Sequence, residues 1–227
     1  MKQRSSRGFT LVEMLVVLFL IGVLAAMIAG IYKLMTHKGA ATRAMGEIHA
    51  ISMACENYRT EHGSYPVLDD VTQGAMVGNP PNATQSNSPI SPLANGDPTV
   101  TAYHQSAQYL YGELGGDPNF KGTHGPNDPM PYYAFRADQL AWAPGASAGT
   151  AGAVSYVKDP FGNCYGYATA EALNEQIYTQ NLQASPSAAR LPAQGFNSTF
   201  DLWSTGGRVD RVLSNPPPIW PQWIKNW

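Results

Sequence analysis

Residues 7–32, with the sequence RGFTLVEMLVVLFLIGVLAAMIAGIY, decide how the first part of this 227-residue chain folds. From Met14 to Tyr32 no residue carries a formal charge, and most are Leu, Val, Ile, Met or Ala. As a helix that rises about 1.5 Å per residue, the stretch from Phe9 to Tyr32 spans about 36 Å, whereas the hydrocarbon core of a bilayer is about 30 Å thick. The stretch therefore predicts a membrane-spanning helix over 9–32.

A short basic segment precedes this stretch. Residues 1–8 contain three cations, Lys2, Arg4 and Arg7, and no acid. By the positive-inside rule the N-terminus is expected in the cytoplasm and the rest of the chain on the opposite side of the membrane. The same pattern also fits a removable secretory signal peptide, with a cleavage point among the small residues at 25–30.

Glu13 argues against a disposable signal peptide. It lies near the start of the apolar stretch, where an unpaired carboxylate costs roughly 2.5–3.5 kcal/mol. A segment that is removed after export has no need of such a residue. An acid at this depth therefore indicates a functional partner of opposite charge.

The segment Arg7-Gly8-Phe9-Thr10-Leu11-Val12-Glu13, followed by an apolar helix, resembles the class III signal of type IV pilins and of type II secretion pseudopilins. In that family a prepilin peptidase cleaves after the glycine on the cytoplasmic face, and the new N-terminal residue is methylated. The resemblance implies that residues 1–8 are a leader, that cleavage falls between Gly8 and Phe9, and that Phe9 is methylated. It also implies that Glu13 pairs with the N-terminal amine of a neighbouring subunit during filament assembly.

The charges of the predicted product agree with such a pairing. An ammonium group and Glu13 in a low dielectric form a pair that is costly to break on one side, because an unpaired buried charge is then left. Loss of the three leader cations leaves 11 of the 14 basic residues against 16 acidic ones, so the net charge changes from −2 to −5. The exported chain is therefore expected to be mildly acidic.

Helical periodicity continues through residues 33–62, which we expect to begin the head, 33–227. The apolar residues recur at spacings of three and four, and they are Ala41, Ala44, Met45, Ile48, Ile51, Ala54, Cys55 and Tyr58. This amphipathic stripe is typical of a helix that packs on a sheet. Gly63 and Pro66 predict the end of the helix. One long helix is thus expected over 9–62.

Residues 63–227 predict a loop-rich α+β region, because Gly and Pro are frequent in this chain, at 22 and 18 residues. Residues 69–101 lack periodicity and predict a long surface loop. Short helices are expected over 104–114 and 170–183. Four short aromatic and β-branched stretches predict strands: Tyr132–Phe135, Val154–Val157, Cys164–Ala168 and Thr199–Trp203. A small antiparallel sheet packed on the long helix gives a type IV pilin-like α+β fold with long loops.

Several head segments are similar to the major, G-type pseudopilins of type II secretion. The long helix ends before a Gly-x-Tyr-Pro turn at 63–66, and residues 159–165 match the pattern Asp-Pro-aromatic-Gly-Asn-x-Tyr. Residues 201–206 follow the pattern Asp-x-aromatic-Ser-x-Gly, and residues 224–227 the ending Ile-x-Asn-Trp. The resemblance covers residues 7–66 and is patchy over 159–227.

In the G-type proteins the C-terminal loop binds calcium through carboxylate, hydroxyl and carbonyl oxygens, the hard ligands that Ca²⁺ prefers. The resemblance implies Asp201 and Ser204 as ligands, with Asp210 as a looser candidate. However, Arg208 and Arg211 stand where the family usually supplies further acids, and two cations oppose a divalent ion. A turn held by side-chain hydrogen bonds is the alternative.

The two cysteines, Cys55 and Cys164, are both expected to face an oxidising compartment after export. One prediction is therefore a disulfide between the long helix and the turn that begins at Asp159. Cys55 lies on the apolar stripe of the helix, which instead favours two separate buried thiols.

The sequence predicts a structural filament subunit rather than an enzyme, because it has no phosphate-binding glycine loop, nucleophile elbow or zinc spacing. We expect a single-pass bacterial inner-membrane protein with a periplasmic head, held in lipid until it assembles into a homopolymeric type II secretion pseudopilus. The expected partners are the prepilin peptidase, the inner-membrane assembly platform and minor pseudopilins, and no nucleic acid is expected. The alternative is a surface type IV pilus subunit, and a remote one is a membrane-anchored enzyme or binding module.

Overall fold

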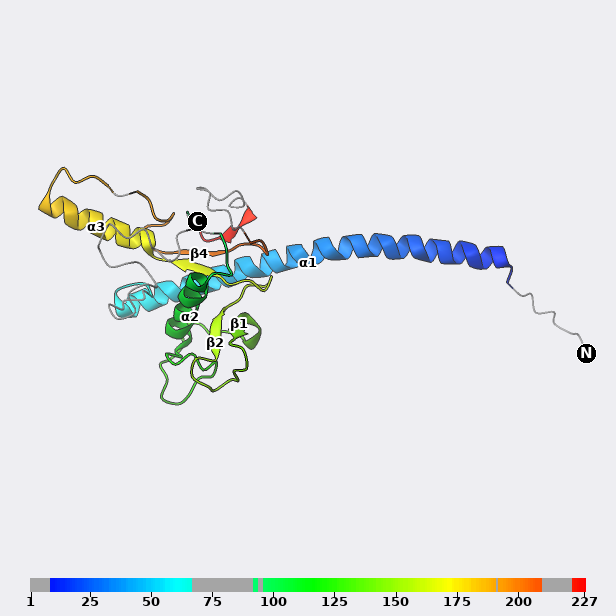
Figure 1. The fold of residues 1–227 in the computed structure, drawn as a ribbon, viewed down its shortest axis with the longest axis horizontal. Helices are drawn as coiled ribbons and strands as arrows, with labels where there is room; N and C mark the ends of the chain where they lie inside the picture. Colours follow the sequence, from blue (N-terminus) through cyan, green and yellow to red (C-terminus); the bar gives the residue numbers. More distant parts are fainter. Residues whose placement is uncertain (1–8, 67–91, 94–95, 191, 210–221) are drawn as a thin grey trace, which may run out of the picture. The chain divides into compact units, whose positions relative to one another are not determined.

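The computed structural model describes five ranges of the chain: residues 9–66, 92–93, 96–190, 192–209 and 222–227. The predicted leader and most of the loop predicted over 69–101 lie outside these residues. The longest element is the helix α1, Leu11–His62 (Figure 1). The prediction of one long helix over 9–62 is confirmed to within two residues at its start.

α1 ends where the sequence predicts. Gly63 has φ 77°, in the left-handed region that glycine adopts without a steric penalty. Its N–H donates to the carbonyl oxygen of Arg59 at 2.8 Å and so closes the last turn. A side chain at position 63 would therefore strain the helix end.

The chain divides into two compact units, residues 1–40 and residues 41–227. The first unit contains the N-terminal part of α1. The second contains the rest of α1 and all the other helices and strands that the structure describes. The boundary that the sequence predicts at residue 32, between the membrane-spanning stretch and the head, stays a prediction.

Among the described residues of the second unit, two further α-helices follow: α2, Thr101–Gly115, and α3, Ala170–Ala184. Both helices predicted from the sequence are confirmed, and α2 begins three residues earlier than predicted. Its C-cap, Gly116, has φ 63° and donates its N–H to the carbonyl oxygen of Gly112. A short 3₁₀ helix, η1, covers Ala137–Gln139.

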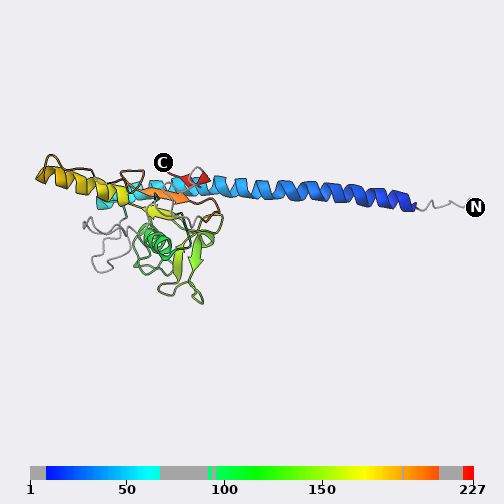
Figure 2. The ribbon, with the colours of Figure 1, turned by 45° about the horizontal axis from the view of Figure 1, so that its top comes forward.

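The strands that the structure describes form two small antiparallel sheets, whereas the sequence predicts one sheet. The first pairs β1, Leu140–Trp142, with β2, Val154–Val157. The second has the order β3-β4-β5, with β3 at Gly166–Ala168, β4 at Asp201–Ser204 and β5 at Ile224–Lys225. α2 packs against β2 of the first sheet and β3 of the second, and Figure 2 shows the head turned by 45° from the view of Figure 1. The α+β class is confirmed.

The strand predicted at Tyr132–Phe135 is wrong. The backbone N–H groups of Tyr132 and Tyr133 both donate to the carbonyl oxygen of Leu114, at 2.8 and 3.0 Å, so this segment caps the end of α2. Its aromatic rings pack there as well, with the ring of Phe135 5.3 Å from that of Tyr111. The aromatic residues that suggested a strand therefore cover a helix end, and β1 follows five residues later.

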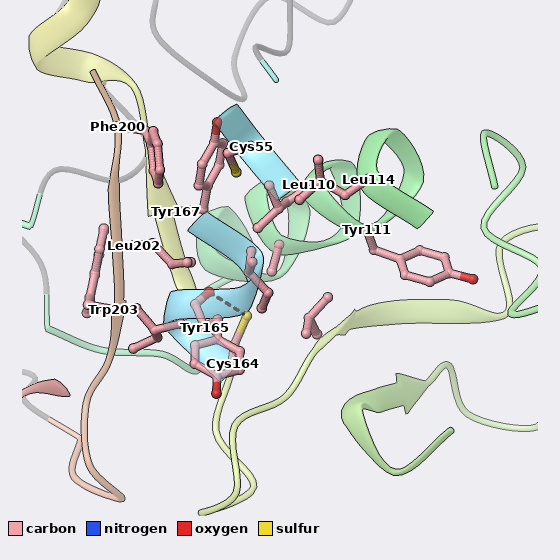
Figure 3. Packing of buried hydrophobic residues seen from close by; sticks show 14 of the residues in the cluster. Cys55, Leu110, Tyr111, Leu114, Cys164, Tyr165, Tyr167, Phe200, Leu202 and Trp203 are labelled. Carbon is pink, nitrogen blue, oxygen red and sulfur yellow. Dashed lines mark hydrogen bonds between the residues drawn. The ribbon is translucent and has the colours of Figure 1, made fainter. Parts of the chain in front are cut away.

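The core of the second unit lies among α1, α2 and the sheets (Figure 3). α1 contributes a buried stripe that matches the predicted one at Ala44, Ile48, Ile51, Ala54, Cys55 and Tyr58. Met45, predicted on the same stripe, is instead 63% exposed. On the sheet side, Trp203 is fully buried, and its indole N–H donates to the hydroxyl of Tyr103 at 3.2 Å.

Cys55 and Cys164 are buried free thiols in this core, and the structure contains no disulfide between them. The sulfur of Cys164 lies 3.4 Å from the carbonyl oxygen of Tyr103 and 3.3 Å from that of Tyr165, either of which accepts its proton. Burial raises the pKa of both thiols well above the usual range. The geometry therefore matches the second prediction, two separate thiols, rather than the disulfide.

Candidate functional site

The start of α1 is held by a reciprocal pair of bonds between Thr10 and Glu13. The carboxylate of Glu13 accepts the backbone N–H and the hydroxyl of Thr10, both at 2.8 Å, and the N–H of Glu13 donates to the Thr10 hydroxyl at 3.2 Å. This is a capping box, in which residues three apart satisfy donors that a helix start leaves free. The cap was not among the predicted features, although the spacing Thr-x-x-Glu is its sequence signature.

Of the two predicted processing residues, Phe9 lies just before this helix. Phe9 is 78% exposed, and Gly8 lies outside the described residues. Leu11–Ile28 has a mean hydropathy of 2.8 and none of it is buried, so by length and composition this helix is able to cross a membrane. Such an exposed apolar surface needs a cover of lipid or of other apolar side chains.

The residues implied as calcium ligands do not meet in the described part of the chain. Asp201 accepts the backbone N–H groups of Phe196 and Asn197, at 2.9 and 3.0 Å. Ser204 is three residues further along β4, on the opposite face of the strand, and donates to Asp159. Asp210 lies outside the described residues. Among the residues that are described, no three His, Cys, Asp or Glu side chains are placed to hold a metal ion. In the described residues Asp201 and Ser204 hold turns by hydrogen bonds on opposite faces of β4, and calcium binding stays a prediction.

The partner of Ser204 is a residue that sequence reasoning did not assign to this site. One oxygen of Asp159 accepts the Ser204 hydroxyl at 2.5 Å, and the other accepts the N–H groups of Phe161 and Asn163, at 2.9 and 2.8 Å. The Ser204 hydroxyl in turn accepts the N–H of Gly206 at 3.1 Å. These bonds join the turn at 159–163 to the end of β4. The two segments resemble pseudopilins separately, and their contact was not evident from the sequence.

We expect Asp159 and Asp201 to make the head less stable as the pH rises from about 4 to about 6. Burial raises the pKa of each carboxyl group to about 6, whereas an aspartate in an unfolded chain has a pKa of about 3.9. Between these values the folded chain binds more protons than the unfolded chain, so the free energy of unfolding falls with rising pH. Urea unfolding of the wild type and of Asp159→Asn, compared at pH 4 and pH 7, measures the contribution of Asp159. From pH 4 to pH 7 the free energy of unfolding is expected to fall less for the variant than for the wild type. A larger fall for the variant would refute the raised pKa of Asp159.

A second buried carboxylate, Glu47, joins α1 to the rest of the head. Its side chain is 5% exposed and accepts three bonds, from Arg43 at 2.9 Å, Arg136 at 2.6 Å and the hydroxyl of Tyr165 at 2.8 Å. Both arginines also bond to Asp138, and these bonds hold the pKa of that carboxyl below its usual range. The Arg43–Glu47 spacing is visible in the sequence, but the other partners lie 89 and 118 residues away.

Replacing Glu47 with alanine is expected to destabilise the head by roughly 2–3 kcal/mol. Removing one member of a buried charge pair costs roughly 3–5 kcal/mol, and here water reaches the two arginines, which are about half exposed, and lowers the cost. The matched control is Asp138→Asn, because that side chain is exposed and surface ion pairs contribute little. Chemical denaturation monitored by Trp fluorescence compares the two variants. Equal stability of Glu47→Ala and the wild type would contradict the role of this network.

A family model and two known proteins are similar to this chain, and the family model covers the start of α1. The family model described as the prokaryotic N-terminal methylation motif matches residues 3–29. Over 83 residues the chain is 35% identical to the type II secretion system core protein G of Pseudomonas aeruginosa. This match covers 35% of the present chain and 58% of the Pseudomonas protein. Over 79 residues the chain is 33% identical to the type II secretion system core protein G of Klebsiella michiganensis. This match covers 34% of the present chain and 54% of the Klebsiella protein. No solved structure matches the chain.

These matches support a pseudopilin-like type IV pilin family for this chain, and the resemblance found in its sequence is confirmed. The chain spans a little over half the length of the core G proteins that it matches. By name, both relatives are core proteins of the type II secretion system. The motif and the apolar helix also agree with a membrane-anchored N-terminus.

Proposed function

We propose that this chain is a filament subunit of a type II secretion pseudopilus, the structure that drives protein export in such a system. Its prepilin peptidase cleaves the leader after Gly8, Phe9 is methylated, and the subunit waits in the bacterial inner membrane with its head in the periplasm. The inner-membrane assembly platform then adds it to a helical homopolymer together with minor pseudopilins.

One observation carries this proposal: the methylation motif lies at the start of a helix whose apolar surface has no cover. Every large apolar side chain described between Leu11 and Ile28 is at least 43% exposed. Lipid covers such a surface in the membrane, and the helices of neighbouring subunits cover it in a fibre. A subunit that exchanges one apolar cover for the other leaves the bilayer without exposing this surface to water.

A strain that lacks this protein tests the function. Loss of exoprotein release with normal surface fibres is expected for a pseudopilus subunit. Loss of surface fibres with normal release would instead indicate the alternative, a type IV pilus subunit. Normal release together with normal fibres would refute a filament role of either kind.

Gly8→Glu is expected to leave the leader uncut. A glycine before the cleavage point lets the peptidase approach the backbone closely, and a glutamate adds both bulk and charge there. The uncut chain keeps its eight leader residues and migrates more slowly than the processed wild type on a denaturing gel. Ser6→Ala, a small change in the same leader, serves as the control and is expected to be processed. Normal processing of Gly8→Glu would contradict the proposed cleavage point.

A further inference from the structure

A cavity of about 500 Å³ lies between the second half of α1 and the last described residues of the chain. The α1 side is lined by Met45, His49 and Ser52, and the opposite side by Phe200, Lys225 and Trp227, among others. The volume lies within the range of about 300–1,000 Å³ that is typical of ligand sites. Nothing in the proposed filament role so far assigns an occupant to it.

The cation of this cavity is Lys225, and it bonds to no acid among the described residues. Lys225 makes no ion pair within the ranges that the structure describes, and its ammonium group lies 5.0 Å from the ring centre of Trp227 and 5.6 Å from that of Phe196. These aromatic rings attract the ammonium group but leave its hydrogen-bond donors free. The nearby amide groups are already used, because Asn197 and Asn226 bond to each other and to the backbone at Phe200.

Two further polar atoms at this cavity have no partner among the described residues. The hydroxyl of Ser52 and the indole N–H of Trp227 are buried and make no hydrogen bond there. Such a buried donor without an acceptor costs free energy, and because neither atom is accessible from the cavity, a ligand oxygen would bond to it only after its side chain moves. The one acid that lines the cavity, Glu56, accepts the hydroxyl of Tyr65 at 3.0 Å. The unsatisfied groups of the cavity are therefore mainly donors, and one of them is cationic.

We propose that this cavity receives an acidic side chain from a neighbouring copy of the chain in the filament, with Lys225 as the group that binds its carboxylate. The inference rests on the proposed function and adds the part of the head that contacts the next subunit. Acids exceed cations by 16 to 11 in the processed chain, so the surface of a second copy offers the complementary charge.

The surroundings of the cavity also fit a protein partner better than a free small anion. Met45, which lines the cavity, is 63% exposed, and Met53, about two turns further along α1, is 57% exposed. Flexible methionine side chains are common on surfaces that bind other proteins. A neighbouring subunit would cover them while its carboxylate reaches Lys225.

Carbodiimide cross-linking of assembled fibres tests this contact, because the reagent joins a lysine amine to a carboxylate that touches it. Fibres grown from an equal mixture of ¹⁴N- and ¹⁵N-labelled full-length chains are treated, digested and analysed by mass spectrometry. We expect a peptide that links Lys225 to an Asp or Glu, with half of the linked pairs of mixed label. Lys225→Arg, which keeps the charge but does not react, is expected to form fibres at wild-type yield without this peptide.

The outcomes separate this contact from the filament role itself. Fibres in which Lys225 forms no cross-link, or links only to an acid of its own chain such as Asp210, would overturn the contact and leave the filament role standing. A wild-type chain that is processed but forms no fibres would overturn both. A second variant, Lys225→Glu, is expected to reduce fibre yield at least tenfold with an unchanged melting temperature, and wild-type yield from it would also overturn the contact.

Discussion

Replacing Glu13 with leucine is expected to leave the chain in the membrane and to abolish its fibres. The substitution makes the apolar stretch longer and uninterrupted, so insertion becomes more favourable. It also removes the carboxylate that we propose as the partner of a neighbour's N-terminal amine, and that amine is then left unpaired in a low dielectric. Membrane fractionation measures insertion, and electron microscopy of sheared fibres measures assembly. Wild-type fibres from Glu13→Leu would contradict the pairing.

The capping box makes two further variants necessary, because Glu13 also holds the helix start. Glu13→Gln keeps an oxygen that accepts the bonds of Thr10 but removes the charge, and it is expected to lose fibres as completely as leucine does. Thr10→Ala weakens the cap by roughly 1 kcal/mol and keeps the charge, and it is expected to form fibres. The reverse pattern, fibres from Glu13→Gln and none from Thr10→Ala, would assign Glu13 to capping alone.

The second large effect is expected from Gly166→Ala in β3. Gly166 lies opposite Trp203 of β4, and a Cβ atom at position 166 would lie closer than 3.0 Å to three atoms of the indole. The indole has no room to move, because it packs edge-on against Tyr103 and stacks on Trp223. Overpacking of a core costs roughly 1–3 kcal/mol and occasionally more, and we expect the upper part of that range here.

Chemical denaturation of the detergent-solubilised chain measures this cost. Gly46→Ala is the matched control, because position 46 is exposed on α1 with no atom within 4 Å of an added Cβ. That change is expected to stabilise the helix by up to about 1 kcal/mol. The double variant Gly166→Ala with Trp203→Phe is expected to recover part of the loss, since the smaller ring leaves room for the methyl group. A Gly166→Ala chain as stable as the wild type would contradict the close packing of β3 on Trp203.

The features that follow from local patterns were predictable from the sequence. α1 and its end at Gly63 follow from periodicity and from a helix stop, and the buried stripe from Ala44 to Tyr58 follows from spacings of three and four. The prediction that Met45 belongs to the buried stripe of α1 is wrong. Met45 lies at the edge of that stripe, and apolar character alone does not distinguish a buried methionine from an exposed one.

The features that depend on distant contacts were not predictable. Tyr132–Phe135 reads as a strand until the end of α2 supplies its hydrogen-bond partner, and the two-residue strand β5 exists because β4 is its neighbour. The bonds that join Glu47 to Arg136, and Asp159 to Ser204, likewise connect segments far apart in the chain. The N-terminal motif does not depend on distant contacts, because its residues are consecutive. It can therefore be recognised from the amino-acid sequence alone.

The filament role depends most directly on where the mature chain begins. Mass spectrometry of the N-terminal peptide, from protein purified out of its own host's membranes, measures this in one step. We predict a peptide that starts at Phe9 and carries one methyl group on its amine. A mature chain that starts near Gly30 would show the apolar helix to be a discarded signal peptide, and the filament role would then be wrong.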